Sequence, residues 1–208
     1  DRKVVVKPSA QGPLVYSSHY YYLELNAARM LHDLNIKGDI PQAEIKANLL
    51  KIQQQESIHL DELQEKAVYE AVNSGLLVIT GGPGTGKTTT INTIIRYFEM
   101  EGMEILLAAP TGRAAKRMAE ATGYEARTIH RLLEPRYDSQ TGGLTFAHNE
   151  REPLDTDAVI LDEASMVDLV LMQALLAALP GKEAGADAIL IEAELPEKAD
   201  DPAMAVRR

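Results

Sequence analysis

The chain contains no cysteine among its 208 residues, so disulfide bonds and thiolate metal sites are excluded. It also lacks a long hydrophobic run. The longest nearly unbroken apolar stretch, residues 169–179, is too short to span a bilayer and is interrupted by Gln173. The first residues contain neither a signal-peptide hydrophobic region nor an initiator methionine. We therefore expect a cytoplasmic protein with no membrane segment, and we expect the chain to be part of a longer protein.

Positive charge is scarce, since 31 acidic residues outnumber 21 lysines and arginines and give a net charge of −10. This total argues against a protein that coats nucleic acid. The charges are unevenly distributed, because much of the negative excess lies between residues 183 and 201. Between residues 111 and 136 the basic residues outnumber the acidic ones, and they are Arg113, Lys116, Arg117, Arg127, Arg131 and Arg136. A local basic strip of this kind can bind phosphates whatever the total charge.

Glycine is concentrated at residues 81–88, which fit the phosphate-loop pattern G-x-x-x-x-G-K-[ST]. A short apolar run at 76–80 precedes this loop, as expected of a buried central strand, and a helical pattern follows from Thr88 to about residue 101. A glycine-rich turn that binds nothing is the alternative, and the presence of strand, loop and helix together disfavours it. We expect a phosphate loop formed by Gly81, Gly82, Pro83, Gly84, Thr85, Gly86, Lys87, Thr88 and Thr89.

The chemistry of such a loop follows from its residue types. Glycines let the backbone curl with its N–H groups pointing inward, which makes an anion-binding nest at a helix N-terminus. Lys87 then supplies a positive charge to the β- and γ-phosphates, and the Thr88 hydroxyl can bind Mg²⁺. A dinucleotide-binding loop would need G-x-G-x-x-G, but Lys87 stands where the last glycine belongs. A nucleoside triphosphate such as ATP is the better ligand.

A second apolar run, residues 159–161, ends in the adjacent carboxylates Asp162 and Glu163. Alone, this pattern is weak and is usually a solvated strand end. Together with the phosphate loop it predicts a strand beside the loop strand that delivers Asp162 to Mg²⁺, with Glu163 orienting or deprotonating the water that attacks the γ-phosphate. The expected catalytic residues are therefore Lys87, Asp162 and Glu163, and the expected metal ligands are Thr88 and Asp162.

The remaining patterns divide the chain into three parts. Residues 1–57 are expected to form a separate helical segment, in which the tyrosines at 20–22 either stack on bases or, as we favour, pack in a core or interface. A helix capped by Asp61 and Gln64 then leads into strands at 76–80, 104–109 and 159–161, basic and short helices at 113–121 and 128–133, and a hairpin near 137–146. This order predicts an α/β fold with a parallel sheet over residues 58–193. Residues 194–208 are rich in Ala, Asp, Glu and Pro, and we expect a disordered tail.

Five motifs follow one another along roughly residues 55–180. They are Leu63-Gln64-x-x-Ala67-Val68, the loop 81–89, Ala109-Pro110-Thr111-Gly112-Arg113-Ala114-Ala115, Thr128-Ile129-His130-Arg131-Leu132-Leu133 and Asp162-Glu163-Ala164-Ser165-Met166-Val167-Asp168. In this order they resemble the first motor domain of a RecD-like superfamily-one DNA helicase. The resemblance implies a RecA-like P-loop NTPase sheet flanked by helices, preceded by a small helical segment.

The same resemblance implies roles for individual residues. Gln64 would read the adenine of ATP, unless it is only a helix cap. The residues expected to face single-stranded DNA are Thr111, Gly112, Arg113, Thr128 and His130. A glycine-opened turn before a basic helix does offer N–H groups and charge to a phosphate. The hairpin resembles the pin that splits the duplex, and a surface hairpin without a role is the alternative.

The sequence departs from the family after the Asp-Glu-Ala-Ser motif. Family members continue with a strand ending in Gly-Asp-x-x-Gln-Leu, whose glutamine senses the γ-phosphate, whereas this chain has only an apolar run at 188–191 in the strand's place. A second motor lobe is also missing from the 208 residues. We therefore expect an incomplete ATP-dependent helicase or translocase motor that binds ATP, Mg²⁺ and single-stranded DNA and is slow by itself. The alternatives are a nucleotide-binding fragment without turnover and the helicase part of a conjugative relaxase.

Overall fold

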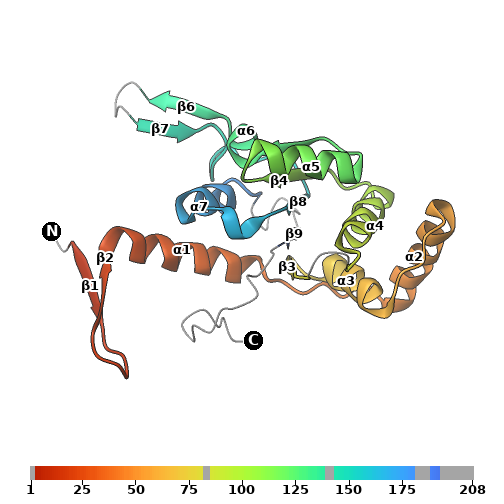
Figure 1. Cartoon of the computed structure of the whole chain (residues 1–208), viewed down its shortest axis with the longest axis horizontal. Helices are drawn as coiled ribbons and strands as arrows, with labels where there is room; N and C mark the ends of the chain where they lie inside the picture. Colours follow the sequence, from red (N-terminus) through yellow and green to blue (C-terminus); the bar gives the residue numbers. More distant parts are fainter. Residues whose placement is uncertain (1–2, 82–84, 139–142, 181–187, 193–208) are drawn as a thin grey trace.

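The computed structural model describes residues 3–81, 85–138, 143–180 and 188–192. Its centre is a five-stranded parallel sheet in the order β3-β9-β8-β4-β5 (Figure 1). The strands are β3 Leu76–Ile79, β4 Ile105–Ala109, β5 Ala126–Thr128, β8 Ala158–Leu161 and β9 Ala188–Glu192. The predicted α/β fold with a parallel sheet is confirmed. The apolar run at 188–191 does form a strand, whereas β5 was not predicted.

Two expectations about the phosphate-loop strand β3 were wrong. The strand β8 does not lie beside β3, because β9 pairs with both: Leu190 is the register partner of Leu77 and of Ile160. In the described part of the sheet β3 is also an edge strand rather than a central one, and its Val78 side chain is 52% exposed. With strands spaced about 4.8 Å apart, the intervening strand sets β3 and β8 roughly 10 Å apart.

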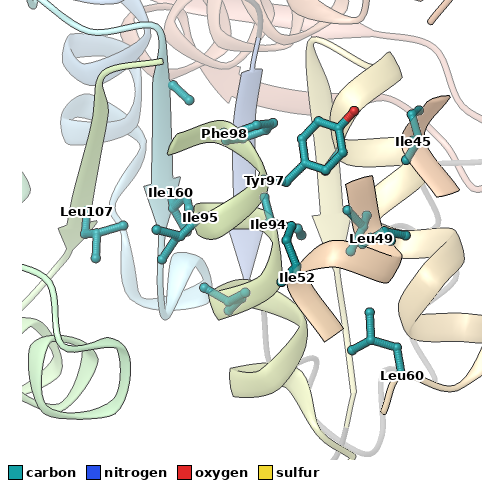
Figure 2. Packing of buried hydrophobic residues seen from close by; sticks show 14 of the residues in the cluster. Ile45, Leu49, Ile52, Leu60, Ile94, Ile95, Tyr97, Phe98, Leu107 and Ile160 are labelled. Atoms are coloured by element: carbon teal, nitrogen blue, oxygen red, sulfur yellow. The ribbon is translucent and has the colours of Figure 1, made fainter. Parts of the chain in front are cut away.

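Helices cover both faces of the sheet. Neighbouring residues of a strand point to opposite sides, so a strand whose residues are all buried, such as β8, must be covered on both faces. Along β8, Ile160 packs with the helices α3 (Glu62–Asn73) and α4 (Lys87–Met100), whereas Val159 and Leu161 pack with α6 (Ile129–Leu133) and α7 (Leu169–Ala177). Figure 2 shows Ile160 of β8 next to Ile95 of α4, with Leu107 of β4 on the other side of Ile160. The helix α5 (Gly112–Thr122) packs against β4 and β5 through its alanines.

The N-terminal part packs on this core. It consists of β1 Val4–Lys7, β2 Leu14–Ser17, α1 Ser18–Leu34 and α2 Gln42–Glu56. Ile45, Leu49 and Ile52 of α2 lie in the same hydrophobic cluster as Ile94 and Tyr97 of α4 (Figure 2). The helix α1 lies along α7 (Figure 1). A domain boundary at residue 57 stays a prediction, although α2 and α4 share a continuous core.

Two surface features bear on the sequence predictions. The hairpin of β6 (Pro135–Asp138) and β7 (Gly143–Phe146) is confirmed and projects from the body (Figure 1), while its turn lies outside the described residues. Tyr20 and Tyr22 do not pack in the core, since they are 59% and 56% exposed, and packing in an interface stays a prediction for them. Only Tyr21 is half-buried, against Tyr16 of β2. Within the described residues, no helix has the length and apolar character needed to cross a membrane.

Candidate nucleotide and DNA site

The parallel sheet brings four sequence motifs to one edge. Because all five strands run in the same direction, their carboxyl ends meet there, which is where open α/β sheets bind ligands. The phosphate loop follows β3, Asp162 follows β8, and Thr111 follows β4 after one residue, Pro110. Thr128 ends β5 and is the register partner of Ala109 in β4. The residues expected to bind nucleotide and those expected to bind DNA therefore share this edge.

Gly81 and the stretch Thr85–Thr89 are the described parts of the phosphate loop, and Gly82, Pro83 and Gly84 lie outside the described residues. Gly86 is the N-cap of α4 with a left-handed φ of 76°, which glycine adopts without strain. At Gly81 an added Cβ would lie 2.7 Å from Thr85 Oγ1, so the backbone passes close to that side chain. Lys87 is the half-buried first residue of α4, and Thr88, next to it, is exposed.

The side chain of Gln64 links α3 to the phosphate loop. Its Oε1 accepts the Asp61 backbone N–H at 2.9 Å, and Asp61 Oδ1 in return accepts the Gln64 N–H at 2.9 Å. This is the predicted capping box. Gln64 Nε2 also donates to the Gly86 carbonyl at 3.4 Å. The capping role of Gln64 is confirmed. The contact of Gln64 with adenine stays a prediction, and in this structure the side-chain amide binds the Gly86 carbonyl at the end of the loop.

This contact makes Gly86 sensitive to substitution. In Gly86→Ala the new Cβ would overlap Gln64 Nε2 and the residue would have to keep a left-handed φ. Left-handed alanine costs about 1–2 kcal/mol, and moving Gln64 Nε2 away breaks its hydrogen bond to the Gly86 carbonyl, which adds about 0.5–1.5 kcal/mol. Gly102→Ala is the matched control, because Gly102 has a φ of 74° with nothing within 4 Å of its Cβ position. Urea unfolding should show a larger loss for Gly86→Ala, and equal losses would contradict the contact.

Asp162 and Glu163 form a tight turn at the end of β8, whose four residues are all buried. Asp162 N–H donates to the Ala108 carbonyl of β4 at 3.0 Å, and Asp162 Oδ1 accepts the Glu163 N–H at 2.8 Å. Glu163 has a left-handed φ of 54°, a conformation that costs a non-glycine residue free energy and that is frequent at functional sites. Both side chains are half-buried. The turn thus holds two carboxylates at fixed places on the carboxyl edge.

The residues here fit a magnesium ion. A threonine hydroxyl and a carboxylate, from Thr88 and Asp162, are oxygen ligands of the kind that Mg²⁺ binds. Among the described residues there is no group of three or more His, Asp or Glu side chains arranged to hold a metal. Mg²⁺ commonly takes only one or two protein ligands and completes its shell with water and substrate phosphates. Two protein ligands, Thr88 and Asp162, are therefore enough for a Mg²⁺ ion that binds together with a nucleotide.

The five residues predicted to face DNA lie at the starts of two helices. Thr111 is the N-cap of α5, where its Oγ1 accepts the Ala114 N–H at 3.2 Å, and Thr128 caps α6 by accepting the Arg131 N–H at 3.2 Å. Gly112, Arg113 and His130 are exposed. The ring of His130 contacts that of Phe146 in β7, with centroids 6.0 Å apart. Each threonine caps one N–H group of its helix. The other N–H groups of a first turn attract anions, so these helix starts suit contacts with phosphates.

Sequence reasoning missed the polar residues that follow Thr89 of the predicted phosphate loop along α4. Thr89, Asn92, Thr93 and Arg96 follow helical spacing, and they line a cavity of about 150 Å³ with residues of α2 and the segment 122–124. The signal was present in the sequence, because these positions alternate with the buried row Ile91, Ile94, Ile95 and Phe98. The apolar row alone predicts the helix. The polar row matters because it begins next to the phosphate loop.

Known proteins match the chain over this region. Residues 64–191 match the protein family described as AAA domain. The ATP-dependent RecD2 DNA helicase of Deinococcus radiodurans is 45% identical over 121 residues, which are 58% of this chain and 16% of the relative. The RecBCD enzyme subunit RecD of Mycolicibacterium smegmatis is 39% identical over 140 residues, 56% of this chain and 25% of the relative. The RecD subunit of Buchnera aphidicola subsp. Acyrthosiphon pisum is 31% identical over 193 residues, 80% of this chain and 31% of the relative.

The chain spans less than a third of the length of each of these relatives. The matched family covers the sheet from the loop-linked Gln64 to Ile191 in β9, which includes both halves of the candidate nucleotide site. The names of these relatives agree with the RecD-like resemblance inferred from the five motifs. The chain therefore belongs to the AAA domain family of P-loop NTPases and, within it, to the RecD-like DNA helicases.

Proposed function

We propose that the chain is the nucleotide-binding lobe of a RecD-like motor and binds Mg-ATP at the carboxyl edge of its sheet. The observation that carries the proposal is the separation of the phosphate loop and the Asp162–Glu163 turn by a single strand, β9. Two strand spacings, roughly 10 Å, leave room for a triphosphate and its metal between the two elements. Lys87 and the loop N–H groups would bind the phosphates, while Thr88 and Asp162 would hold Mg²⁺.

Glu163 has a separate role in this proposal. Its carboxylate would orient or deprotonate the water that attacks the γ-phosphate, since it follows the metal-binding Asp162 directly and is fixed by the backbone turn. Mg²⁺ bound with ATP would neutralise charge on the phosphates. The sequence has no Gly-Asp-x-x-Gln motif to sense the γ-phosphate. This absence favours binding without efficient turnover as the activity of the 208 residues, and the RecD names of the relatives favour a RecD-like motor over a conjugative relaxase.

We further propose that single-stranded DNA passes over the starts of α5 and α6. The support is the position of Thr111 and Thr128 at the ends of the neighbouring strands β4 and β5, with exposed basic and small residues beside them. A strand of DNA lying across both helix starts could receive backbone N–H groups from each and charge from Arg113. The complete motor would use ATP binding and hydrolysis to move along this strand. A cytoplasmic location is part of the same proposal.

Arg113→Ala tests the DNA contact. Loss of one phosphate contact should lower the slope of log affinity against log salt concentration by about 0.7 for a single strand. Fluorescence anisotropy with a labelled oligo(dT) at several salt concentrations would measure this slope. Arg29→Ala is the control, because Arg29 is an exposed arginine on α1, a helix that packs along α7. No DNA binding at low salt, or equal slopes in both variants, would contradict the DNA site.

A further inference from the structure

Arg96 lies at the centre of a polar network that joins three parts of the fold. Its guanidinium contacts Glu56 at the end of α2 at 3.2 Å and Glu99 on α4 at 3.1 Å. It also donates a hydrogen bond to Tyr124 Oη at 2.6 Å and lies 5.5 Å from the centre of the Tyr124 ring. Tyr124 Oη in turn donates to Glu99 Oε2 at 2.6 Å. The network thus fastens α4 to Tyr124, which lies between α5 and β5.

A second contact joins the same two segments one helical turn closer to the phosphate loop. Asn92 Nδ2 donates to the carbonyl of Ala121 near the end of α5 at 3.3 Å. Asn92 and Arg96 therefore form two consecutive rungs between α4 and residues 121–124. The buried Met118 of α5 adds an apolar contact, since it belongs to the same core cluster as Ile94 of α4. Helices α4 and α5 are neighbours in the fold (Figure 1).

The two segments that these rungs join lead to different predicted ligands. The helix α4 begins at Lys87, which is also part of the phosphate loop. A shift of the loop on nucleotide binding would therefore move the first turn of α4. Residues 111–130 form one continuous segment with the predicted DNA contacts at its two ends, Thr111 to Arg113 and Thr128 to His130. The rungs contact the middle of this segment. A movement of α4 would therefore reach both ends of the DNA-facing segment through the same attachment.

The protonation states keep the network intact at physiological pH. Burial is the largest cause that raises the pKa of Tyr124, to about 12, and the hydrogen bond to Glu99 adds to it. Tyr124 therefore remains a hydroxyl that can donate to Glu99. The hydrogen bond to Glu99 likewise raises the pKa of Arg96, which stays charged. The groups that face Arg96 are Glu56, Glu99 and Tyr124, so the carboxylates that balance its charge come from two different helices.

Stability alone does not account for this arrangement well. The side chains of Arg96, Glu56 and Glu99 are 40–45% exposed, and exposed ion pairs contribute little to folding stability. What sets the network apart is its position between the segment that starts at the nucleotide site and the segment that carries the DNA site. We propose that Arg96 and Tyr124 are positioning residues that couple nucleotide binding to DNA binding. This inference rests on the proposed function, since it needs both ligands.

The test is the affinity for labelled oligo(dT), measured by anisotropy with and without saturating Mg-ADP. Coupling between two sites typically changes affinity about 5- to 150-fold, and we expect a change in this range for the native chain. Tyr124→Phe removes only the hydroxyl that bridges Arg96 and Glu99. We expect it to reduce the coupling to less than about twofold while each ligand alone binds within about twofold of native affinity. Arg96→Met should behave like Tyr124→Phe, and Arg29→Met, which removes an exposed ion pair on α1, should leave the coupling unchanged.

Hydrogen exchange supplies a readout that needs no DNA. Mg-ADP should slow amide exchange in residues 122–130 of the native chain, because the network transmits the ordering of α4, and it should not do so in Tyr124→Phe. Equal coupling in native chain and both network variants would overturn the inference, and so would a native chain whose DNA affinity and 122–130 exchange ignore Mg-ADP. A native chain that binds no Mg-ADP at all would instead contradict the proposed function.

Discussion

The purified 208-residue chain should hydrolyse ATP about 10³- to 10⁵-fold more slowly than a complete motor and should not unwind DNA. Phosphoryl transfer is faster when positive groups stabilise the negative charge of the departing γ-phosphoryl group, and loss of an arginine finger alone costs a factor of this size. The resemblance to RecD-like motors implies that such arginines come from a second lobe, and the 208 residues contain neither a second lobe nor the Gly-Asp-x-x-Gln sensor. Ground-state contacts to the phosphates remain, so binding should survive where transition-state stabilisation fails.

A steady-state phosphate-release assay with oligo(dT) present measures this rate. Glu163→Gln is the informative variant, because it removes the carboxylate that would act on water while keeping the side chain's size. It should bind Mg-ATP with native affinity and lower any residual turnover further. Turnover of several per second by the native chain would contradict the prediction, and it would mean that the missing groups come from elsewhere, such as a second copy of the chain.

The second large effect is expected for Lys87→Ala, which should lower the affinity for Mg-ATP at least tenfold. Lys87 opens α4 directly after Gly86, and its ammonium is the charge that the phosphate loop offers to the β- and γ-phosphates. A charge-assisted hydrogen bond contributes about 1.5–3 kcal/mol, and each 1.4 kcal/mol corresponds to a factor of ten. Isothermal titration calorimetry measures the two affinities.

Lys66→Ala is the control for this experiment. Lys66 is an exposed lysine of α3, and it lies on the face of that helix opposite to Gln64, which contacts the loop. It should bind Mg-ATP like the native chain. Circular dichroism before each titration checks that the variants are folded. Equal affinity in native chain and Lys87→Ala would remove the phosphate loop from the nucleotide site altogether.

Local sequence patterns predicted the parts of this fold that depend on neighbours along the chain. The capping box at Asp61 and Gln64, the loop between β3 and α4, and the turn after β8 each arise from residues within a few positions of one another. The hairpin of β6 and β7 is of the same kind, since paired residues close over a short turn. Such features follow from capping, glycine conformation and strand propensity, which a sequence displays directly.

The features that were missed depend on packing between distant segments. Nothing in the apolar run at 158–161 reveals that β9 separates it from β3, because strand order is decided by how the helices cross the sheet. Tyr20 and Tyr22 are exposed at the start of α1, whereas the residues of α1 that cluster with α7 lie further along the helix, from Ala27 to Leu34. The role of Arg96 was likewise hidden, because its partners come from residues 56 and 124, far from it in sequence. Only the three-dimensional fold shows which charges meet.

We propose that the carboxyl edge of the sheet holds Mg-ATP between the phosphate loop and the Asp162 turn. A crystal structure of the chain grown with ADP and Mn²⁺ in place of Mg²⁺ tests this site most directly, because the anomalous signal of Mn²⁺ locates the metal independently of the protein. We expect the β-phosphate within hydrogen-bond distance of Lys87 Nζ, and the metal at roughly 2.0–2.2 Å from Thr88 Oγ1 with Asp162 bound directly or through water. A nucleotide bound away from residues 81–89, or a metal that contacts neither Thr88 nor the Asp162 turn, would contradict the account.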